Sequence, residues 1–200
     1  MLLPPHAHFL SDQFISFPEG KNISCADMKL ITSKFNCQHL KNKEPFILQN
    51  TVSRTIGILF SGVLKSTSAK AREENKIRAM YFEGFNNVVI DCNSFGKNNV
   101  SRFGIYSRKE STLLTISETD FNDLCRTLPL FDLIGRNMLT DSCNAHQNWL
   151  LNIEHLESDE KLKWFKANFP KEDSDFYDIE KMFLLDISKN NIKNKATKTP

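Results

Sequence analysis

The chain has 200 residues, of which 40% are hydrophobic and 25% charged, and its formal net charge is +2. These values are ordinary for one or two small globular domains, and they exclude collagen-like, coiled-coil and largely disordered chains. The apolar stretches are too short to span a membrane, and the N-terminal residues do not resemble a signal peptide. We therefore expect a cytoplasmic protein that does not associate with membranes.

The cysteines and histidines give no indication of a catalytic or metal site. The five cysteines are widely spaced and form no CxxC pair, which indicates reduced thiols rather than a zinc or iron–sulfur site. His6 and His8 have the spacing of a metal-binding pair, but no further ligand stands at a matching distance. Motifs of the GxSxG, P-loop and GxGxxG types are absent from the sequence. We expect no metal, no cofactor and no enzymatic activity.

The N-terminal part of the chain is expected to be helical. Residues 9–36 show two short helical patterns. Ser24 is a suitable N-cap for the second helix, whose apolar positions are Met28, Ile31 and Phe35.

The middle of the chain, from about residue 40 to residue 116, has the texture of a β-structure. Short runs rich in β-branched and aromatic residues alternate with polar or glycine-containing segments. The runs are residues 45–48, 56–60, 77–82, 88–90, 103–106 and 113–116. Many short strands at close spacing predict an antiparallel sandwich or barrel. The polar segment 66–75 is expected to be a solvated hairpin tip.

Helical patterns return after Ile116. Ser117 or Thr119 is expected to begin a helix that ends before Pro129. An apolar stripe then runs through residues 131–153 and predicts a helix of about 20 residues. A helix of this length exceeds the need of one small domain, so the stripe is either core or a dimer contact. Our hypothesis is a homodimer whose contact residues are Ile134, Met138, Trp149 and Ile153.

The C-terminal part is expected to be helical and strongly asymmetric in charge. Ser158 is expected to cap a helix that stops at Pro170. A short helix over residues 178–185, a turn at 186–188 and a lysine-rich helix from Lys189 should follow. Residues 154–186 carry a net charge of −5, whereas residues 189–200 carry +4.

This order of elements resembles the Crp/Fnr superfamily of bacterial transcription regulators. The best single match is Leu59-Phe60-Ser61-Gly62-Val63-Leu64-Lys65, which resembles the family's Ile-Leu-Ser-Gly-Leu-Val-Lys stretch. Further similar segments are residues 39–46, 82–85, 113–121 and 156–170.

The resemblance implies an α+β fold. Its parts would be an antiparallel β jelly roll of the cyclic-nucleotide-binding type, a long dimerisation helix and a small, degenerate helix-turn-helix region. The implied divisions are residues 1–128 for the roll with its N-terminal helices, 129–155 for the dimerisation helix and 156–200 for the C-terminal region.

The resemblance also implies a ligand site in residues 85–103, where the family holds a cyclic phosphate. The Gly-Glu-Leu expected there is absent, and Val88 and Val89 stand near the position of the carboxylate. An ungapped match places Ser101, not Arg102, at the family's arginine position. Two interpretations therefore stay open. In the first, a small anionic effector binds at Ser101, Arg102, Asn86 and Asn87. In the second, Arg102 lies on the surface and the roll is empty or filled by side chains. Cyclic AMP itself is not expected to bind.

The resemblance further implies that the last helix would enter the major groove of double-stranded DNA. Its candidate contacts are Asn190 and Asn191 to base edges, and Lys193, Lys195 and Lys198 to phosphates. The usual glycine of the turn is missing, the helix has no arginine, and the preceding segment is acidic. Two functions remain: a transcription regulator that couples ligand sensing to DNA binding through its dimer helix, and a ligand-binding or scaffold module that does not bind DNA.

Overall fold

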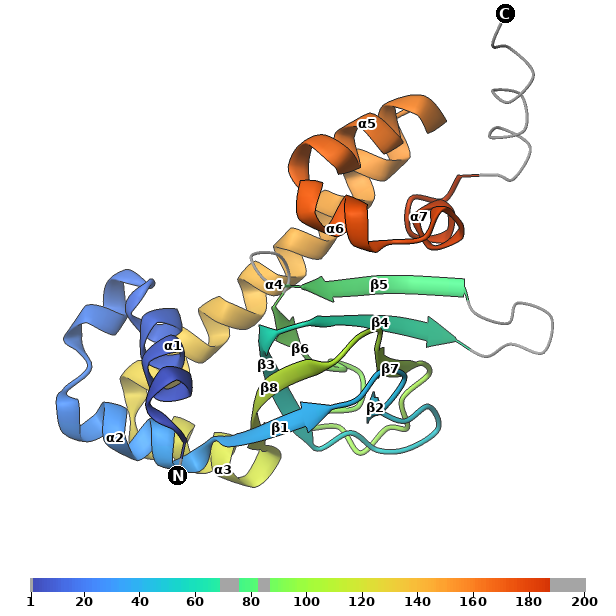
Figure 1. Cartoon of the computed structure of the whole chain (residues 1–200). Coiled ribbons are helices and arrows are strands. Elements are labelled where there is room, and N and C mark those ends of the chain that lie inside the picture. Colours follow the sequence, from blue (N-terminus) through green and yellow to red (C-terminus); the bar gives the residue numbers. More distant parts are fainter. Residues whose placement is uncertain (1, 69–75, 83–86, 188–200) are drawn as a thin grey trace, which may run out of the picture.

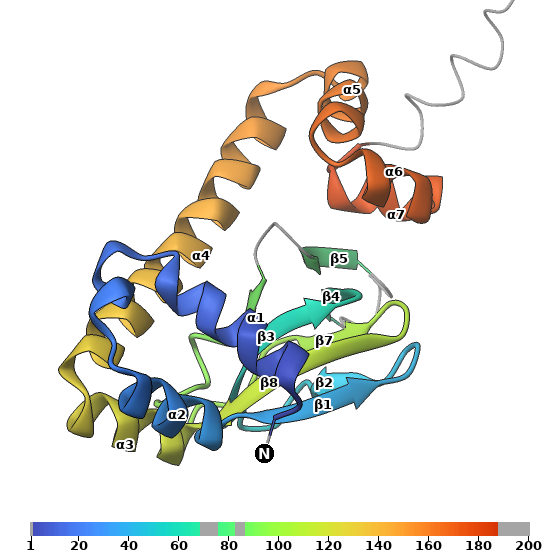
Figure 2. The same ribbon diagram turned by 60° about the vertical axis from the view of Figure 1, so that its left-hand side comes forward.

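The computed structural model describes residues 2–68, 76–82 and 87–187. Two stacked β-sheets form the centre of this part of the chain. A group of N-terminal helices and one long helix lie beside the sheets, and a second group of helices follows the long helix (Figure 1; Figure 2).

In the described residues, eight strands form an antiparallel jelly roll. One sheet has the order β1-β8-β3-β6 and the other the order β2-β7-β4-β5. The strands are β1 Asn36–Leu40, β2 Pro45–Ile47, β3 Thr55–Ser61, β4 Val63–Ser68, β5 Lys76–Phe82, β6 Val88–Val89, β7 Gly104–Ser107 and β8 Ser111–Ser117. Every pairing is antiparallel, and this strand order is that of two interlocked Greek keys. The predicted antiparallel sandwich is confirmed.

The sheet that contains β3 and β8 is buried on both faces. On its inner face, Leu59 and Leu113 pack with Leu64 and Ile105 of the opposite sheet. On its outer face, the neighbouring positions of the same two strands, Ile56, Ile58, Leu114 and Ile116, pack against the N-terminal helices and the long helix. A strand that is covered on both faces has a continuous apolar run instead of alternation. This double burial explains the run Ile56-Gly57-Ile58-Leu59-Phe60.

A glycine is required at the turn between β3 and β4. Gly62 has a φ of +103°, and a Cβ there would lie 2.2 Å from the Ser111 Oγ. Ser111 in turn accepts a hydrogen bond from the Val63 amide at 3.1 Å. The backbone of β8 therefore closes on this turn so tightly that no side chain fits.

One predicted loop is wrong at its beginning. The segment 66–75 was expected to be a solvated tip, but β4 continues through Ser68, and Ser66 is only 1% exposed. Ser66 pairs with Ala79 on one side and with Ile105 on the other, so it occupies a central position in its sheet. Residues 69–75 lie outside the described residues.

The N-terminal helices are α1 Pro4–Ile15, the 3-10 helix η1 Pro18–Asn22 and α2 Cys25–Lys34. The cap of α2 is the predicted one, because the Asp27 amide donates to the Ser24 Oγ at 3.1 Å. Helix α1 begins earlier than residue 9, at a proline that already has a helical φ and needs no amide partner.

Two helices follow the last strand, as predicted. In α3, Glu118–Thr127, the N-cap is Ser117, whose Oγ accepts from the Asp120 amide at 3.1 Å. Helix α4, Pro129–His155, has 27 residues and begins with its proline at the first position. It runs obliquely past the roll from the N-terminal helices to the C-terminal helices (Figure 1).

The apolar stripe of α4 is core within a single chain. Ile134 and Met138 are 0% and 9% exposed and belong to the cluster beneath α1. Trp149 and Ile153 are 5% and 7% exposed and belong to a second cluster with the C-terminal helices and β5. The expectation that these four side chains meet a second copy is therefore corrected, because packing inside one chain already covers them. A dimer contact along α4 would have to use the opposite face.

The C-terminal helices are α5 Ser158–Asn168, α6 Pro170–Asp175 and α7 Asp178–Leu184. Glu157, not Ser158, caps α5 in a capping box, in which the Glu160 side chain accepts from the Glu157 amide at 3.0 Å. The turn after α7 does without the expected glycine, because Asp186 itself adopts a φ of +51°. The Ile187 amide then donates to the Met182 carbonyl at 2.9 Å and closes the helix end.

Candidate ligand site between the roll and the long helix

A cavity of about 310 Å³ lies between the roll and α4. The roll and its loops contribute Ser66, Ala79, Tyr81, Val88, Ile90, Cys92, Asn93 and Phe103, and α4 contributes Leu139, Ser142, Cys143, His146 and Gln147. The volume is at the lower end of the range for small-molecule sites, which are mostly apolar with a few polar groups. The lining has this character.

One buried hydroxyl in the cavity wall has no partner. The Ser66 Oγ makes no hydrogen bond to the described residues, although Ser66 is 1% exposed. A buried polar group without a partner costs about 1–3 kcal/mol. A ligand or water that exchanges a hydrogen bond with the Ser66 hydroxyl would remove this penalty, so Ser66 marks the polar end of the cavity.

Three titratable groups of the cavity, His146, Tyr81 and Cys92, have pKa values shifted towards their neutral forms. Burial lowers the pKa of the His146 imidazole. Burial raises the pKa of Tyr81, and the nearby Cys92 and Asp91 raise it further. Burial also raises the pKa of Cys92, as does the neighbouring Cys143. None of the lining residues that the structure describes is an arginine or a lysine.

Three of the four residues predicted to bind an anion, Asn87, Ser101 and Arg102, do not line this cavity. Ser101 is fully buried, and its hydroxyl donates to the Phe103 carbonyl at 2.6 Å. Arg102 is exposed, and the Asn87 amide donates to the Gln13 side chain at 2.8 Å. Asn86 lies outside the described residues. An exposed Arg102 beside a buried Ser101 is the arrangement that the ungapped match implied, and it is in line with the second interpretation, in which Arg102 lies on the surface.

The segment expected to hold a phosphate also lacks a helix. Residues 87–103 form β6 and a series of turns, so within them no helix N-terminus is present to bind an anion. In the described residues, no group of three histidine, cysteine or acidic side chains is placed to hold a metal ion.

The sequence spacing of the α4 residues could have predicted that they line a cavity, but it was not used for this purpose. Leu139, Ser142, Cys143 and His146 follow the spacing i, i+3, i+4 and i+7, which places them on one helical face. Polar residues within a mostly apolar stripe indicate a face that borders a cavity. Ser66 had no such signal, because it stands in a polar segment that resembles a loop.

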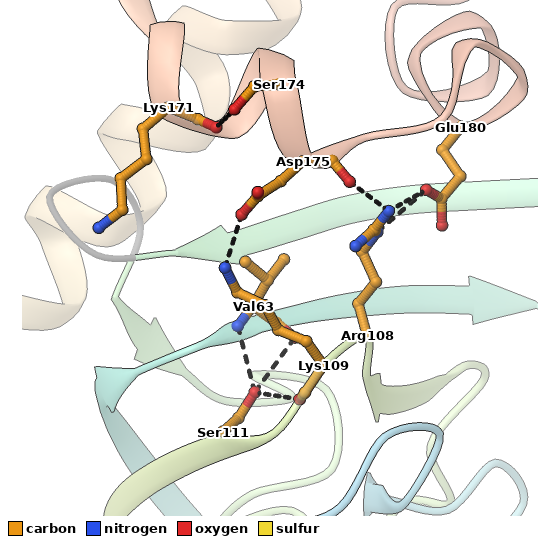
Figure 3. A network of polar contacts seen from close by, with 8 residues as sticks. All are labelled: Val63, Arg108, Lys109, Ser111, Lys171, Ser174, Asp175 and Glu180. Carbon is orange, nitrogen blue, oxygen red and sulfur yellow. Dashed lines mark hydrogen bonds and ion pairs between the residues drawn. The ribbon is translucent and has the colours of Figure 1, made fainter.

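A second site of close contact joins the C-terminal helices to the roll. Arg108, in the β7–β8 hairpin, points at Glu180 of α7 (Figure 3). Its Nε and Nη2 both lie 2.9 Å from the Glu180 Oε2, and Nη2 also donates to the Asp175 carbonyl at 2.5 Å. The guanidinium stands 5.0 Å from the centre of the Phe176 ring. Lys109 pairs with the Asp175 carboxylate at 2.6 Å.

An apolar cluster beneath these ion pairs completes the contact. Phe82 of β5 meets the Phe169 ring edge-on at 5.1 Å between ring centroids. Trp149 of α4 packs against Trp164 and Phe165 of α5, at 5.1 Å and 5.9 Å between ring centroids. The three C-terminal helices are therefore docked on the β5 edge of the roll and on the end of α4 (Figure 2).

The residues predicted to contact DNA, Asn190, Asn191, Lys193, Lys195 and Lys198, lie outside the described residues. Among the helices that the structure describes, none has an apolar stretch long enough to cross a membrane.

The fold can now be compared with known proteins. No family model and no curated protein sequence matches the chain. Solved structures do match it. The c-di-GMP-responsive global regulator CLP of Xanthomonas campestris shares 11% identity at a TM-score of 0.63, over 86% of this chain and 89% of CLP. FixK2 of Bradyrhizobium japonicum shares 8% identity at a TM-score of 0.62, over 82% of this chain and 83% of FixK2. The Thermus thermophilus catabolite activator protein shares 15% identity at a TM-score of 0.53, over 89% of this chain and 84% of the activator protein.

These likenesses define the class of fold. The chain has a Crp/Fnr-like cyclic-nucleotide-binding fold, with a jelly roll, a long helix and helices beyond it. The resemblance noted in the sequence is confirmed at this level.

Proposed function

We propose that this chain is a transcription regulator in which a small effector, bound in the cavity, controls the position of the C-terminal helices. The observation that supports this most strongly is the double role of α4. The helix forms one wall of the cavity through Leu139 and His146, and it carries Trp149 into the cluster beneath α5–α7. Suppose that α4 can adopt two positions relative to the roll and that the effector binds one of them more tightly. Binding would then shift the population towards that position, and the cavity wall and the C-terminal helices would change together.

The effector in this proposal is not cyclic AMP. A buried cyclic phosphate would find neither an arginine nor a lysine among the described lining residues, and an unpaired buried charge is strongly unfavourable. Isothermal titration of the full chain with cyclic AMP is expected to give no binding heat at micromolar concentrations. A micromolar dissociation constant would contradict this part of the proposal.

The proposal places DNA binding in residues 189–200. Asn190 and Asn191 would contact base edges, and Lys193, Lys195 and Lys198 would contact phosphates. The regulator CLP, which links cell–cell signalling to virulence gene expression, has the same fold. That likeness supports a role in gene regulation, and the lysine-rich segment supports contact with a polyanion.

Fluorescence anisotropy with a labelled random-sequence duplex tests this function. We expect binding that weakens steeply as salt rises from about 50 to about 200 mM, because each phosphate contact releases counterions. Replacing Lys193, Lys195 and Lys198 by alanine should reduce both the affinity and the salt slope. The matched control replaces three lysines of α5, Lys161, Lys163 and Lys166, and should leave the slope unchanged.

The second candidate function is a scaffold or ligand-binding module without DNA contact. The observation that favours it is the docking of the acidic C-terminal helices on the roll through Arg108 and Lys109. If the duplex does not bind even at about 50 mM salt, where nonspecific electrostatic binding is strong, the scaffold function replaces the regulator.

A further inference from the structure

Two cysteines from different parts of the fold meet at the cavity. Cys92 lies in the turn after β6, and Cys143 lies in α4. Both line the cavity and both are exposed to solvent. The Cys143 thiol is near enough to Cys92 to raise its pKa. The pair therefore combines close approach with access for a small reagent.

The backbone on each side of the pair is firmly held. On the roll side, the buried Asp91 accepts from the Asn93 amide at 2.9 Å, and its carbonyl accepts from the Phe95 amide at 2.8 Å. On the helix side, the Ser142 hydroxyl lies 3.5 Å from the Val88 carbonyl, one residue away from Cys143. These contacts hold the two segments that carry the sulfurs on opposite walls of one cavity, so a reaction between the sulfurs would be intramolecular.

We propose that Cys92 and Cys143 are a reversible disulfide site that closes when the protein reacts with a hydroperoxide, and that the bond fastens α4 to the roll. This role goes beyond effector binding and does not depend on it. A disulfide requires sulfurs about 2 Å apart, so the two thiols must approach each other before the bond forms.

The two thiols take different parts in the reaction. Burial of part of its side chain and the neighbouring Cys143 raise the pKa of Cys92, so Cys92 is given the second step. The attack on the peroxide falls to Cys143 in this proposal, since the thiolate form of a cysteine is the nucleophile. Its sulfur bonds to one peroxide oxygen, the O–O bond breaks, and the other oxygen leaves with a proton as an alcohol or as water.

The second step forms the disulfide. The Cys92 sulfur attacks the sulfenic acid on Cys143, the S–O bond breaks, and the released hydroxide takes the Cys92 proton to leave as water. In total, two thiols lose two electrons and two protons. The hydroperoxide accepts them and is reduced to an alcohol and water, or to two waters for hydrogen peroxide.

The other cysteines have different neighbours. The Cys37 Sγ lies 3.6 Å from the His39 Nε2, and Cys125 lies near Asp132, which raises its pKa further than burial alone. Cys25 is exposed at the start of α2. These three thiols serve as internal controls for nonspecific oxidation.

Peptide mapping of the full chain tests the proposal. The protein is treated with equimolar hydrogen peroxide, free thiols are blocked with iodoacetamide, and the protein is digested with trypsin without reductant. The five cysteines fall in five different tryptic peptides, and Cys92 and Cys143 fall in residues 79–97 and 137–161. We expect these two peptides to appear joined, and to separate after treatment with a phosphine reductant.

Two substitutions sharpen the test. In Cys92→Ser, the joined peptides should disappear, and the sulfenic acid on Cys143 should persist and react with dimedone. In the control Cys25→Ser, the joined peptides should form as in the wild type. The proposal is overturned if Cys92 and Cys143 stay alkylated as free thiols. A Cys143 link between two chains, or bridges that involve Cys25, Cys37 or Cys125 in equal amounts, would overturn it as well.

Discussion

The guanidinium of Arg108 and the carboxylate of Glu180 form a half-buried ion pair across 72 residues of sequence, and each side chain is 13% exposed. Arg108 is rigidly placed, because its backbone amide donates to the Val63 carbonyl at 2.8 Å, and the Ser107 hydroxyl bonds to the Lys109 carbonyl in the same hairpin. The pair fastens α7 to the roll at one defined point.

Removing this arginine should loosen the C-terminal helices without unfolding the roll. Arg108→Ala leaves the partly buried Glu180 carboxylate with only the longer contact to Lys65 at 3.3 Å, which should destabilise the docked helices by about 2 kcal/mol. The chain has two tryptophans, and Trp149 and Trp164 contact each other in this cluster. Tryptophan emission therefore reports on docking, while far-ultraviolet circular dichroism checks that the secondary structure as a whole is kept. The control Arg126→Ala breaks the exposed pair with Asp123 and should change neither signal.

The docking should weaken in acid. Burial alone would raise the pKa of Glu180, but the hydrogen bond and charge of Arg108 outweigh it and hold that pKa below its usual 4.5. The Lys109 hydrogen bond likewise lowers the pKa of Asp175. Carboxylates with lowered pKa values stabilise the folded form above their usual pKa, and this contribution is lost as pH falls through the lowered values. Tryptophan emission should therefore change below about pH 4.5. Glu180→Gln should flatten this transition, and an unaltered profile in that variant would contradict the assignment.

The apolar stripe of α4 should behave as core. Ile134→Ala removes a fully buried side chain and should lower the free energy of unfolding by about 3 kcal/mol. Leu30→Ala is the matched control, since Leu30 has the same side-chain volume and lies 38% exposed on α2; its effect should be below about 1 kcal/mol. Urea denaturation measures both. Equal effects would mean that Ile134 is not packed within the chain.

The turn at Gly62 should tolerate no side chain. Gly62→Ala combines a positive φ with a Cβ that would collide with Ser111, and it should destabilise the protein by about 3 kcal/mol. Gly96→Ala is the control. Gly96 also has a positive φ, +73°, but a Cβ there would have nothing within 4 Å, so about 1 kcal/mol is expected. Thermal unfolding should rank the two variants in this order.

A homodimer along α4 remains our prediction, now through the exposed face of the helix. Leu150 and Leu151 are 49% and 50% exposed there, whereas the stripe at Met138 faces inwards. Light scattering should give a dimer for the wild type and a monomer for Leu151→Glu, because a charge in a small apolar contact is strongly unfavourable. Leu30→Glu, at an exposed position of α2, should stay dimeric. A monomeric wild type would end the idea.

The sequence was sufficient for the elements but not for their contacts. Short apolar runs and the caps at Ser24 and Ser117 follow local rules, so the roll and its flanking helices were predictable. An apolar stripe, in contrast, looks the same whether it faces its own chain or a second copy, and this is why Ile134 and Trp149 were assigned to a dimer contact. The pairing of Arg108 with Glu180 had no local signal at all.

The candidate site was predictable only in outline. The resemblance implied a ligand site within residues 85–103, at Ser101 and Arg102, whereas the cavity is lined by the roll and by α4 together. Arg102 is exposed beside a buried Ser101, which is the alternation of faces that the ungapped match implied. The α4 side of the cavity was more predictable, because Leu139, Cys143 and His146 follow the regular spacing of an uninterrupted helix.

The length of α4 gives the molecule a mechanical amplifier. Ile134 and Trp149 are fifteen residues apart, or roughly 22 Å along the helix axis at 1.5 Å per residue. If the helix pivots about Ile134, a tilt of about 5° displaces the indole of Trp149 by roughly 2 Å over that arm. A displacement of α4 beside Leu139, near the pivot, would thus be about three times larger at Trp149, because Trp149 is three times as many residues from Ile134. The aromatic rings there meet edge to face, and such a displacement would separate them.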